Sequence, residues 1–276
     1  MKTTSRSLTL GSLVILALLT CLPLASAQNQ GKRQWTVWHE SCPIYASIDR
    51  ASSPPLEELA KGAILDGVRY FKAADNVEWI AFKHEGAVRY APHAYLTHIP
   101  PQNSIKGNLP FGKEKVDRWS GLPHNYKPTD LIVIPSRYCW NTFEHQLRKE
   151  AQKALKEMLD AAKEEKRLSI RVVSSYRSAS WQSRKYLEQL KKLGLGQKVS
   201  AKPGHSEHQL GTTVDVTGGD PRHLLKESFG GTAESLWLKE NCAKFGFRIT
   251  YTKENQKQTG YIPEPWHLRY IGKKPR

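Results

Sequence analysis

Short runs of apolar residues alternate with polar and turn-forming residues over positions 35 to 98. The runs recur roughly every ten residues, a spacing typical of strands in a small all-β domain. They read TVWHESCPIYASI, AILDGVRYF, VEWIAFKHEG and AVRYAPHAYLTHI. The pattern therefore predicts a β domain over residues 35–98.

The pattern changes over residues 99–128, which are dense in Pro, Gly and Lys and predict a linker. Residues 129–276 are expected to form a second domain. Apolar residues recur there at three- and four-residue spacing over 143–167, which predicts one long helix. Two further helices are predicted over 180–193 and 233–245. Short strands are predicted over 168–174, 212–217, 247–251 and 268–271. Because helices and strands mix without regular βαβ repetition, we expect an α+β fold.

The first 27 residues have the three parts of a secretory signal peptide. A basic start is followed by an almost wholly apolar run over residues 8–24 and by the small-residue sequence Ala25-Ser26-Ala27. An uncleaved membrane anchor is the alternative, which Pro23 and the cleavage sequence disfavour. No later stretch has the roughly 18 to 20 apolar residues that a bilayer span needs. We expect cleavage near Ala27 and export to the periplasm, the cell wall or the medium.

Composition narrows the classes of partner. The chain has 276 residues, of which 39% are hydrophobic, with 8 Trp, 11 Tyr and 7 Phe, so bulk disorder is excluded. The formal net charge of +16 favours polyanions such as nucleic acid, anionic lipid or an acidic cell wall. Export and the lack of a Lys/Arg cluster with interleaved aromatic residues argue against nucleic acid.

Three cysteines remain after the predicted cleavage, namely Cys42, Cys139 and Cys242. Export permits a disulfide. The odd number leaves one thiol over, and the sequence does not choose a pair. None of them lies in a Cys-x-x-Cys sequence, so a cysteine zinc site is not expected.

Three motifs of the second segment carry candidate chemistry: SSYRSASWQ from residue 174, HSEHQLGTTVD from residue 205 and EPWHLRY from residue 264. A hydrolytic zinc site takes three protein ligands and keeps one position open. His208 and Asp215 are separated by Gly211, which allows the sharp approach of a loop that enters a strand. His267 is expected to close the site from a distant strand.

A carboxylate and an arginine complete this constellation. Glu264 lies three residues before His267, where it can take a proton from water and give one to a leaving amine. Arg177 offers a planar positive group for a carbonyl oxygen or a carboxylate. Each residue alone has an ordinary structural alternative, such as a helix cap or a surface charge. Together they indicate a metal-assisted amide hydrolase.

These motifs resemble those of the VanY-type D-alanyl-D-alanine carboxypeptidases, a zinc peptidase group that also contains VanX dipeptidases and L,D-carboxypeptidases. The family patterns are Ser-x-Tyr-Arg-Ser with a Gln four residues on, Ser-x-His-x-x-Gly-x-Ala-x-Asp, and Glu-x-Trp-His. The resemblance covers about residues 120 to 272 and implies a small antiparallel sheet with helices. The matching residues are Ser174, Tyr176, Arg177, Ser178, Gln182, Ser206, His208, Gly211, Asp215, Glu264, Trp266 and His267.

The resemblance also implies roles for individual residues. The implied ligands of one zinc ion per chain are His208, Asp215 and His267. Glu264 is the implied general base and acid, and Arg177 the implied stabiliser of the oxyanion. Ser206 and Gln182 are expected to help seat the end of the substrate.

Two neighbouring positions depart from the family pattern or lie outside it. Thr213 stands where the pattern has Ala, and its extra bulk beside the ligand strand bears on rate and specificity rather than on metal binding. His205 is not a ligand position of the family and is expected at the rim of the pocket.

The N-terminal β segment resembles a bacterial SH3-like domain. The matching positions are Tyr45, Ala46, Lys61-Gly62, Trp79-Ile80, Gly86 and Tyr90 to Leu96. In that family such domains hold cell-wall peptides or position a catalytic partner. A purely structural β domain remains an equal alternative.

The expected reaction is hydrolysis of the terminal peptide bond of peptidoglycan stem peptides with release of D-alanine. An L,D-carboxypeptidase acting on tetrapeptides and an endopeptidase cutting cross-bridges share these motifs. A non-catalytic wall-binding protein is disfavoured, because all three implied ligands and the base are present. The sequence does not decide among the three enzymes, between wall remodelling and antibiotic resistance, or between oligomeric states.

Overall fold

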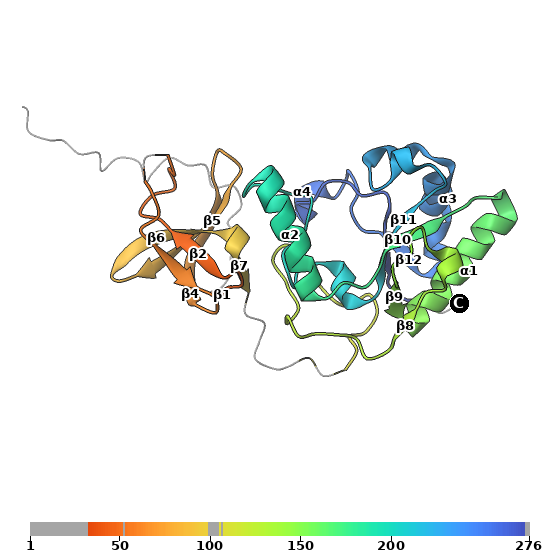
Figure 1. Ribbon diagram of the computed structural model, residues 1–276, viewed down its shortest axis with the longest axis horizontal. Helices are drawn as coiled ribbons and strands as arrows, with labels where there is room; N and C mark the ends of the chain where they lie inside the picture. The colour runs from red at the N-terminus through yellow and green to blue at the C-terminus, as the bar shows by residue number, and fades with distance from the viewer. Residues whose placement is uncertain (1–32, 52, 99–104, 106, 274–276) are drawn as a thin grey trace, which may run out of the picture. The chain divides into compact units, whose positions relative to one another are not determined.

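The computed structural model describes residues 33–51, 53–98, 105 and 107–273 (Figure 1). The predicted signal peptide lies outside these residues. Within the described part of the chain, no helix is both long and apolar enough to cross a membrane. Contacts between residues place Arg33–Arg276 in one compact unit.

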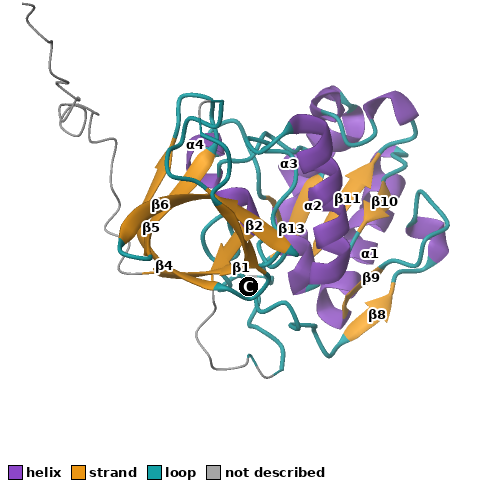
Figure 2. Ribbon diagram, turned by 60° about the vertical axis from the view of Figure 1, so that its left-hand side comes forward, coloured by secondary structure: helices purple, strands orange, loops and turns teal. Residues whose placement is uncertain are grey.

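The N-terminal part is built from strands, as the alternation of apolar and polar residues predicts. An antiparallel five-stranded sheet has the order β6-β5-β4-β1-β7, and it curves around a core (Figure 2). Its strands are β1 (Arg33–Val37), β4 (Ile64–Lys72), β5 (Glu78–His84), β6 (Ala87–Pro92) and β7 (Leu96–His98). A separate hairpin pairs β2 (Ser41–Ile44) with β3 (Glu57–Ala60).

Alternate residues of these strands fill one small core. Trp35, Leu65, Ile80, Phe82 and Leu96 are among its buried members. A short 3-10 turn, His93–Tyr95, joins β6 to β7. The all-β character of this part agrees with the sequence pattern, whereas its SH3-like classification stays a prediction.

The C-terminal part mixes helices and strands, which confirms the predicted α+β class. Its antiparallel sheet has the order β10-β11-β13-β12. The strands are β10 (Arg171–Ser174), β11 (Thr213–Thr217), β12 (Phe247–Ile249) and β13 (His267–Tyr270). The α-helices are α1 (Lys149–Lys166), α2 (Ala179–Leu193), α3 (Ala233–Asn241) and α4 (Gln256–Thr259).

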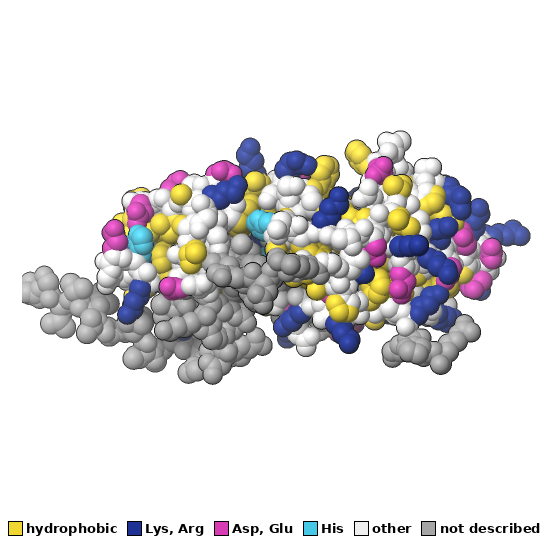
Figure 3. Space-filling view, turned by 90° about the horizontal axis from the view of Figure 1, so that it is seen from below, with side chains coloured by type: hydrophobic (Ala, Val, Ile, Leu, Met, Phe, Trp, Pro, Cys, Tyr) yellow, Lys and Arg dark blue, Asp and Glu magenta, His cyan; other side chains and the backbone are white. Residues whose placement is uncertain are grey.

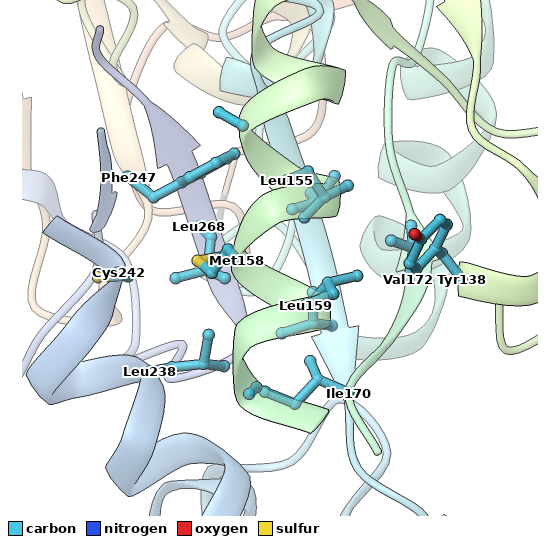
Figure 4. Close-up of a cluster of buried hydrophobic side chains, with 14 of the residues drawn as sticks. Tyr138, Leu155, Met158, Leu159, Ile170, Val172, Leu238, Cys242, Phe247 and Leu268 are labelled. Carbon is cyan, nitrogen blue, oxygen red and sulfur yellow. The ribbon is translucent and has the colours of Figure 1, made fainter. Parts of the chain in front are cut away.

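Helix α1 supplies much of the core of this part. Figure 4 shows Leu155, Met158 and Leu159 on the helix beside Leu268 and Phe247 of the sheet. These side chains recur every three or four residues and form one apolar face. The core thereby fixes β13, whose first residue is His267.

Helix α1 begins six residues later than its periodicity predicts. Residues Gln146–Arg148 form strand β9, which pairs with β8 (Leu131–Val133). Arg148 then forms an ion pair with Asp130 at 3.0 Å. Leu147 is fully buried in this strand, and an apolar residue at its position also fits the helical spacing. The spacing of apolar residues alone therefore did not locate the start of the helix. Phe143, which was predicted to start the helix, is 71% exposed.

The described residues of the predicted linker contribute to packing. Val116, Leu122 and Tyr126 form a buried cluster with Leu210. The predicted domain boundaries stay predictions. In the described part of the chain, the three cysteines are free and buried.

We expect Leu155→Ala to reduce the free energy of unfolding by about 2–5 kcal/mol, because it removes a fully buried side chain from the core between α1 and the sheet. Chemical denaturation monitored by circular dichroism measures this loss. Leu193→Ala, at an exposed position of α2, is the matched control. Equal stability of the two variants would contradict the packing described here.

Candidate active site

Three backbone segments bring the predicted ligands together. Asp215 lies in β11 directly opposite His267 of β13. His208 lies in the 3-10 turn Glu207–Leu210, which precedes β11. Gly211 ends this turn with a φ of 68°, and a Cβ there would lie 2.8 Å from the Leu131 side chain. The turn therefore needs glycine to lead from His208 into the strand.

The ligand atoms of His208, Asp215 and His267 lie within 4.8 Å of one another, and all three residues are buried. Nε2 of His208 is 3.2 Å from Oδ2 of Asp215. Nδ1 of His267 is 3.1 Å from Oδ1 of the same carboxylate. The structure thus gathers the three residues predicted from the motifs around one point.

The ring of His208 is oriented by a hydrogen bond from the ring nitrogen that faces away from Asp215. Its Nδ1 lies 2.7 Å from the carbonyl oxygen of Ser175, which can only accept a hydrogen bond, so Nδ1 carries the proton. Burial and the charge of Arg177 lower the pKa of His208 to about 4, so the ring is neutral. Nε2 then presents a lone pair to the Asp215 carboxylate, and within the described part of the chain it is buried without a hydrogen-bond partner. Two lone pairs that face each other in a buried site suit a cation between them.

His267 is held from its opposite side by a carboxylate. Nε2 of His267 is 3.0 Å from Oε2 of Glu207, whose side chain is 2% exposed. Oε1 of Glu207 accepts a hydrogen bond of 2.6 Å from Nη1 of Arg269, and Glu114 contacts the same guanidinium at 2.9 Å. Although burial opposes ionisation, hydrogen bonding from His267 and the charge of Arg269 lower the pKa of Glu207 to about 2.

The surroundings of His267 favour positive charge. Burial alone would lower its pKa, but hydrogen bonds to Asp215 and Glu207, together with the charges of Asp215 and Glu264, raise it to about 10. Nδ1 is the ring nitrogen that faces Asp215 and Glu264, so it is the nitrogen available to a metal. The donor set of two imidazoles and one carboxylate fits a zinc ion.

Glu264 lies beside this cluster as predicted. Its Oε2 is 3.4 Å from Nδ1 of His267, and its backbone N–H donates to the carbonyl oxygen of Tyr251 at 3.0 Å. Burial raises the pKa of Glu264 to about 7, against the opposing charges of His267 and Arg177. A carboxyl group of this kind can both accept and release a proton near neutral pH.

Arg177 reaches the cluster from the loop before α2. Its Nη1 is 3.9 Å from Oδ2 of Asp215 and donates to Oγ of Ser174 at 3.3 Å. Nε of Arg177 is buried and makes no hydrogen bond to any described residue. The guanidinium therefore keeps donor capacity for an oxygen atom in the site.

Ser206 and Gln182 support the backbone around the cluster. Oγ of Ser206 accepts a hydrogen bond from the backbone N–H of His208 at 3.4 Å. Nε2 of Gln182 donates to Oγ of Ser200 at 3.1 Å and to the carbonyl oxygen of Ala201 at 2.8 Å. Their predicted contact with substrate stays a prediction.

Thr213 and His205 are the two positions near the ligands that depart from the family pattern or lie outside it. Thr213 is fully buried in β11, the strand that carries Asp215, and its expected effect on rate and specificity stays a prediction. The placement of His205 at the pocket rim was wrong, because this side chain is fully buried. It contacts the hydroxyl of Thr97 and the carbonyl oxygen of Asp117 instead.

Sequence patterns did not single out Glu207 or Tyr251. Glu207 lies between two motif residues, but its partner Arg269 is 62 positions away, and no local spacing connects them. The ring of Tyr251 packs 4.7 Å from that of His267, from a segment outside the three motifs.

Comparison with known proteins agrees with this geometry. Residues 144–273 match the family model VanY, D-alanyl-D-alanine carboxypeptidase. The bifunctional D-Ala-D-Ala dipeptidase and D-Ala-D-Ala carboxypeptidase VanXYC of Enterococcus gallinarum is 31% identical over 155 residues, which cover 55% of this chain and 78% of that protein. The chain belongs to the VanY family.

Two further proteins are similar to this chain over more than half of its length. The putative carboxypeptidase YodJ of Bacillus subtilis is 39% identical over 166 residues; the match covers 58% of this chain and 59% of the length of the Bacillus protein. The solved structure of the LdcB LD-carboxypeptidase is 40% identical, with a TM-score of 0.54 and coverage of 58% of this chain and 76% of that one. The family resemblance drawn from the three motifs is confirmed.

We expect Glu207→Gln to weaken zinc binding by about 10- to 100-fold, because the neutral amide supports the His267 ring less strongly than a carboxylate does. Competition with a chromophoric chelator measures the Kd. The control is Glu188→Gln on the exposed face of α2. An unchanged Kd for Glu207→Gln would show that this buried carboxylate does not support the metal site.

Proposed function

We propose that this chain is a zinc-dependent carboxypeptidase that removes the terminal D-alanine from peptidoglycan stem peptides. One observation carries the proposal: the lone pair of His208 Nε2 faces the Asp215 carboxylate without a hydrogen-bond partner among the described residues, and His267 and Glu264 lie beside it. Membership in the VanY family supports the reaction class.

The residues that would hold the zinc ion are His208, Asp215 and His267. When bound, a zinc ion lowers the pKa of a water molecule toward 7 and polarises a carbonyl group. The carbonyl oxygen of Ser175 holds the proton of His208 on Nδ1 and leaves Nε2 free, and Glu207 binds Nε2 of His267 so that Nδ1 faces the site.

Glu264 moves the protons of the reaction. Its carboxylate accepts a proton from the attacking water and then donates a proton to the departing amino group of D-alanine. Burial, which raises the pKa of Glu264 to about 7, suits both transfers. Arg177 donates hydrogen bonds to the oxygen on which negative charge develops, and its buried position strengthens that interaction.

A second candidate is an L,D-carboxypeptidase acting on tetrapeptides. It is supported by the solved LdcB LD-carboxypeptidase, which is 40% identical to this chain. An endopeptidase that cuts cross-bridges has the same catalytic residues and needs an open cleft instead of a closed end. These three enzymes differ in where they cut, which a direct product analysis distinguishes.

Export to the wall compartment is part of the proposal. The leader-like residues 1–27 and the net charge of +16 support it, because peptidoglycan and its attached polymers are anionic. Lys and Arg side chains are spread across the visible face of the molecule, with Asp and Glu between them (Figure 3). Contact of the N-terminal sheet with the wall also belongs to the proposal.

Incubation with a stem pentapeptide and a stem tetrapeptide, followed by mass spectrometry, tests the reaction. We expect loss of one alanine from the pentapeptide alone. Loss of alanine from the tetrapeptide alone would replace the proposal by the L,D-carboxypeptidase. Cleavage at an internal bond would indicate an endopeptidase, and two intact peptides would refute the hydrolase.

We expect Glu264→Gln to retain zinc and to lose about two to four decades of kcat, the usual contribution of general acid–base catalysis. Zinc content and turnover are measured on the same preparation. Glu254→Gln, an exposed substitution of the same kind, is the control. Near-normal turnover of Glu264→Gln would exclude this residue as the proton carrier.

A further inference from the structure

Buried polar contacts join the N-terminal sheet to the segment that leads into His208. This segment, residues 200–208, is referred to below as the ligand segment. Two of its residues, Lys202 and His205, place polar side chains against the turn His93–Tyr95 and strand β7. Neither residue takes part in the proposed reaction, so these contacts need a separate explanation.

Lys202 is the first contact. Its side chain is only 5% exposed, and Nζ donates to the carbonyl oxygen of Leu96 and to Nε2 of His93, both at 2.8 Å. Burial lowers the pKa of Lys202 well below its ordinary value, and a buried amino group without such partners is unfavourable. Both partners belong to the N-terminal part, so the position of Lys202 depends on that part.

His93 connects Lys202 to the ion pair between Glu78 and Arg118. Burial and the charge of Lys202 lower the pKa of His93 to about 3, so its ring is neutral and Nε2 accepts from Lys202. Nδ1 then donates to Oε2 of Glu78 at 2.9 Å. The same carboxylate oxygen contacts Nη2 of Arg118 at 2.6 Å, and Nη1 of Arg118 donates to the carbonyl oxygen of Gly260. The chain of contacts therefore begins and ends in the C-terminal part and passes through the sheet.

His205 is the second contact. It is fully buried, and Nδ1 lies 2.8 Å from the carbonyl oxygen of Asp117, so Nδ1 carries a proton. Nε2 forms a hydrogen bond of 2.9 Å with the hydroxyl of Thr97 in β7. A Cβ on Gly121 would lie 2.9 Å from this nitrogen, which shows how closely the ring is enclosed.

The ligand segment carries groups of the site between and beside these anchors. Oγ of Ser200 and the carbonyl oxygen of Ala201 accept hydrogen bonds from Nε2 of Gln182. Ser206 follows His205 directly and accepts from the backbone N–H of His208. The anchors therefore lie within the stretch of backbone that orients one of the three ligands.

We propose that the N-terminal sheet is a structural part of the peptidase and that Thr97, through His205, is a positioning residue for the metal-binding turn. Lys202 and His93 form a second anchor of the same kind. This proposal rests on the proposed function only in taking His208 as a metal ligand. It replaces the picture of a catalytic domain to which the sheet is merely tethered.

The test compares Thr97→Val, which removes the hydroxyl but keeps the shape, with Thr97→Ser, which keeps the hydroxyl. Because Thr97→Val removes the hydroxyl that bonds to the buried Nε2 of His205, we expect backbone amide exchange of residues 200–208 to accelerate about 5- to 100-fold. Exchange in helix α1 should be unchanged, and the zinc Kd should rise about 3- to 30-fold. Thr97→Ser should resemble the wild type in both measurements.

Lys202→Met provides a second, independent test, because it removes the buried amino group and retains an apolar side chain of similar length. Faster exchange confined to the ligand segment, residues 200–208, in both variants supports the proposal. Unchanged exchange in that segment would overturn it, and so would a uniform loss of protection that includes α1, which would mark general destabilisation. If the wild-type protein binds no zinc, the proposed function fails, whereas the exchange measurement still decides the positioning role.

Discussion

The structure depends on the placement of one buried carboxylate, that of Asp215, between the imidazoles of His208 and His267. Asp215 faces Nε2 of His208 and Nδ1 of His267, while the outer nitrogens bind Ser175 and Glu207. Burying these groups is unfavourable unless a positive charge lies among them. The raised pKa of His267 reflects this requirement, and a divalent ion would meet it by replacing a proton. The region around β11 and β13 is therefore organised for a ligand that strengthens the fold as it binds.

The groups that bind the outer nitrogens of the two histidines are themselves held by further hydrogen bonds. The carbonyl of Ser175 fixes one imidazole, and the Ser175 hydroxyl accepts from the backbone N–H of Gln146 at 3.0 Å. Glu207 fixes the other imidazole and is itself neutralised by Arg269. These contacts explain why the ligands can be held in one geometry although one of them, His208, lies in a short 3-10 turn. Rigidity comes from charged hydrogen bonds in a buried region, where they are stronger than in water.

Sequence patterns predicted the α+β class and the convergence of His208, Asp215 and His267, because motif spacing constrains residues that share one chemical task. They failed where tertiary contacts decide the outcome. Residues 146–148 form a strand because β8 pairs with them, although a helical period runs through the same positions. His205 was expected at the rim of the pocket, but it is buried against Thr97, which lies 108 positions away. The local spacing of apolar residues does not predict either of these long-range contacts.

The two halves of the chain differ in sequence pattern yet share buried charge. An exposed ion pair between them would contribute little and would break easily. Glu78 and Lys202 are instead shielded from water and satisfied through His93, so separating the halves would expose or orphan several polar groups at once. Such an interface favours a single relative arrangement of the sheet and the ligand segment. The boundary between an all-β pattern and an α+β pattern in the sequence thus need not mark a point at which the protein moves.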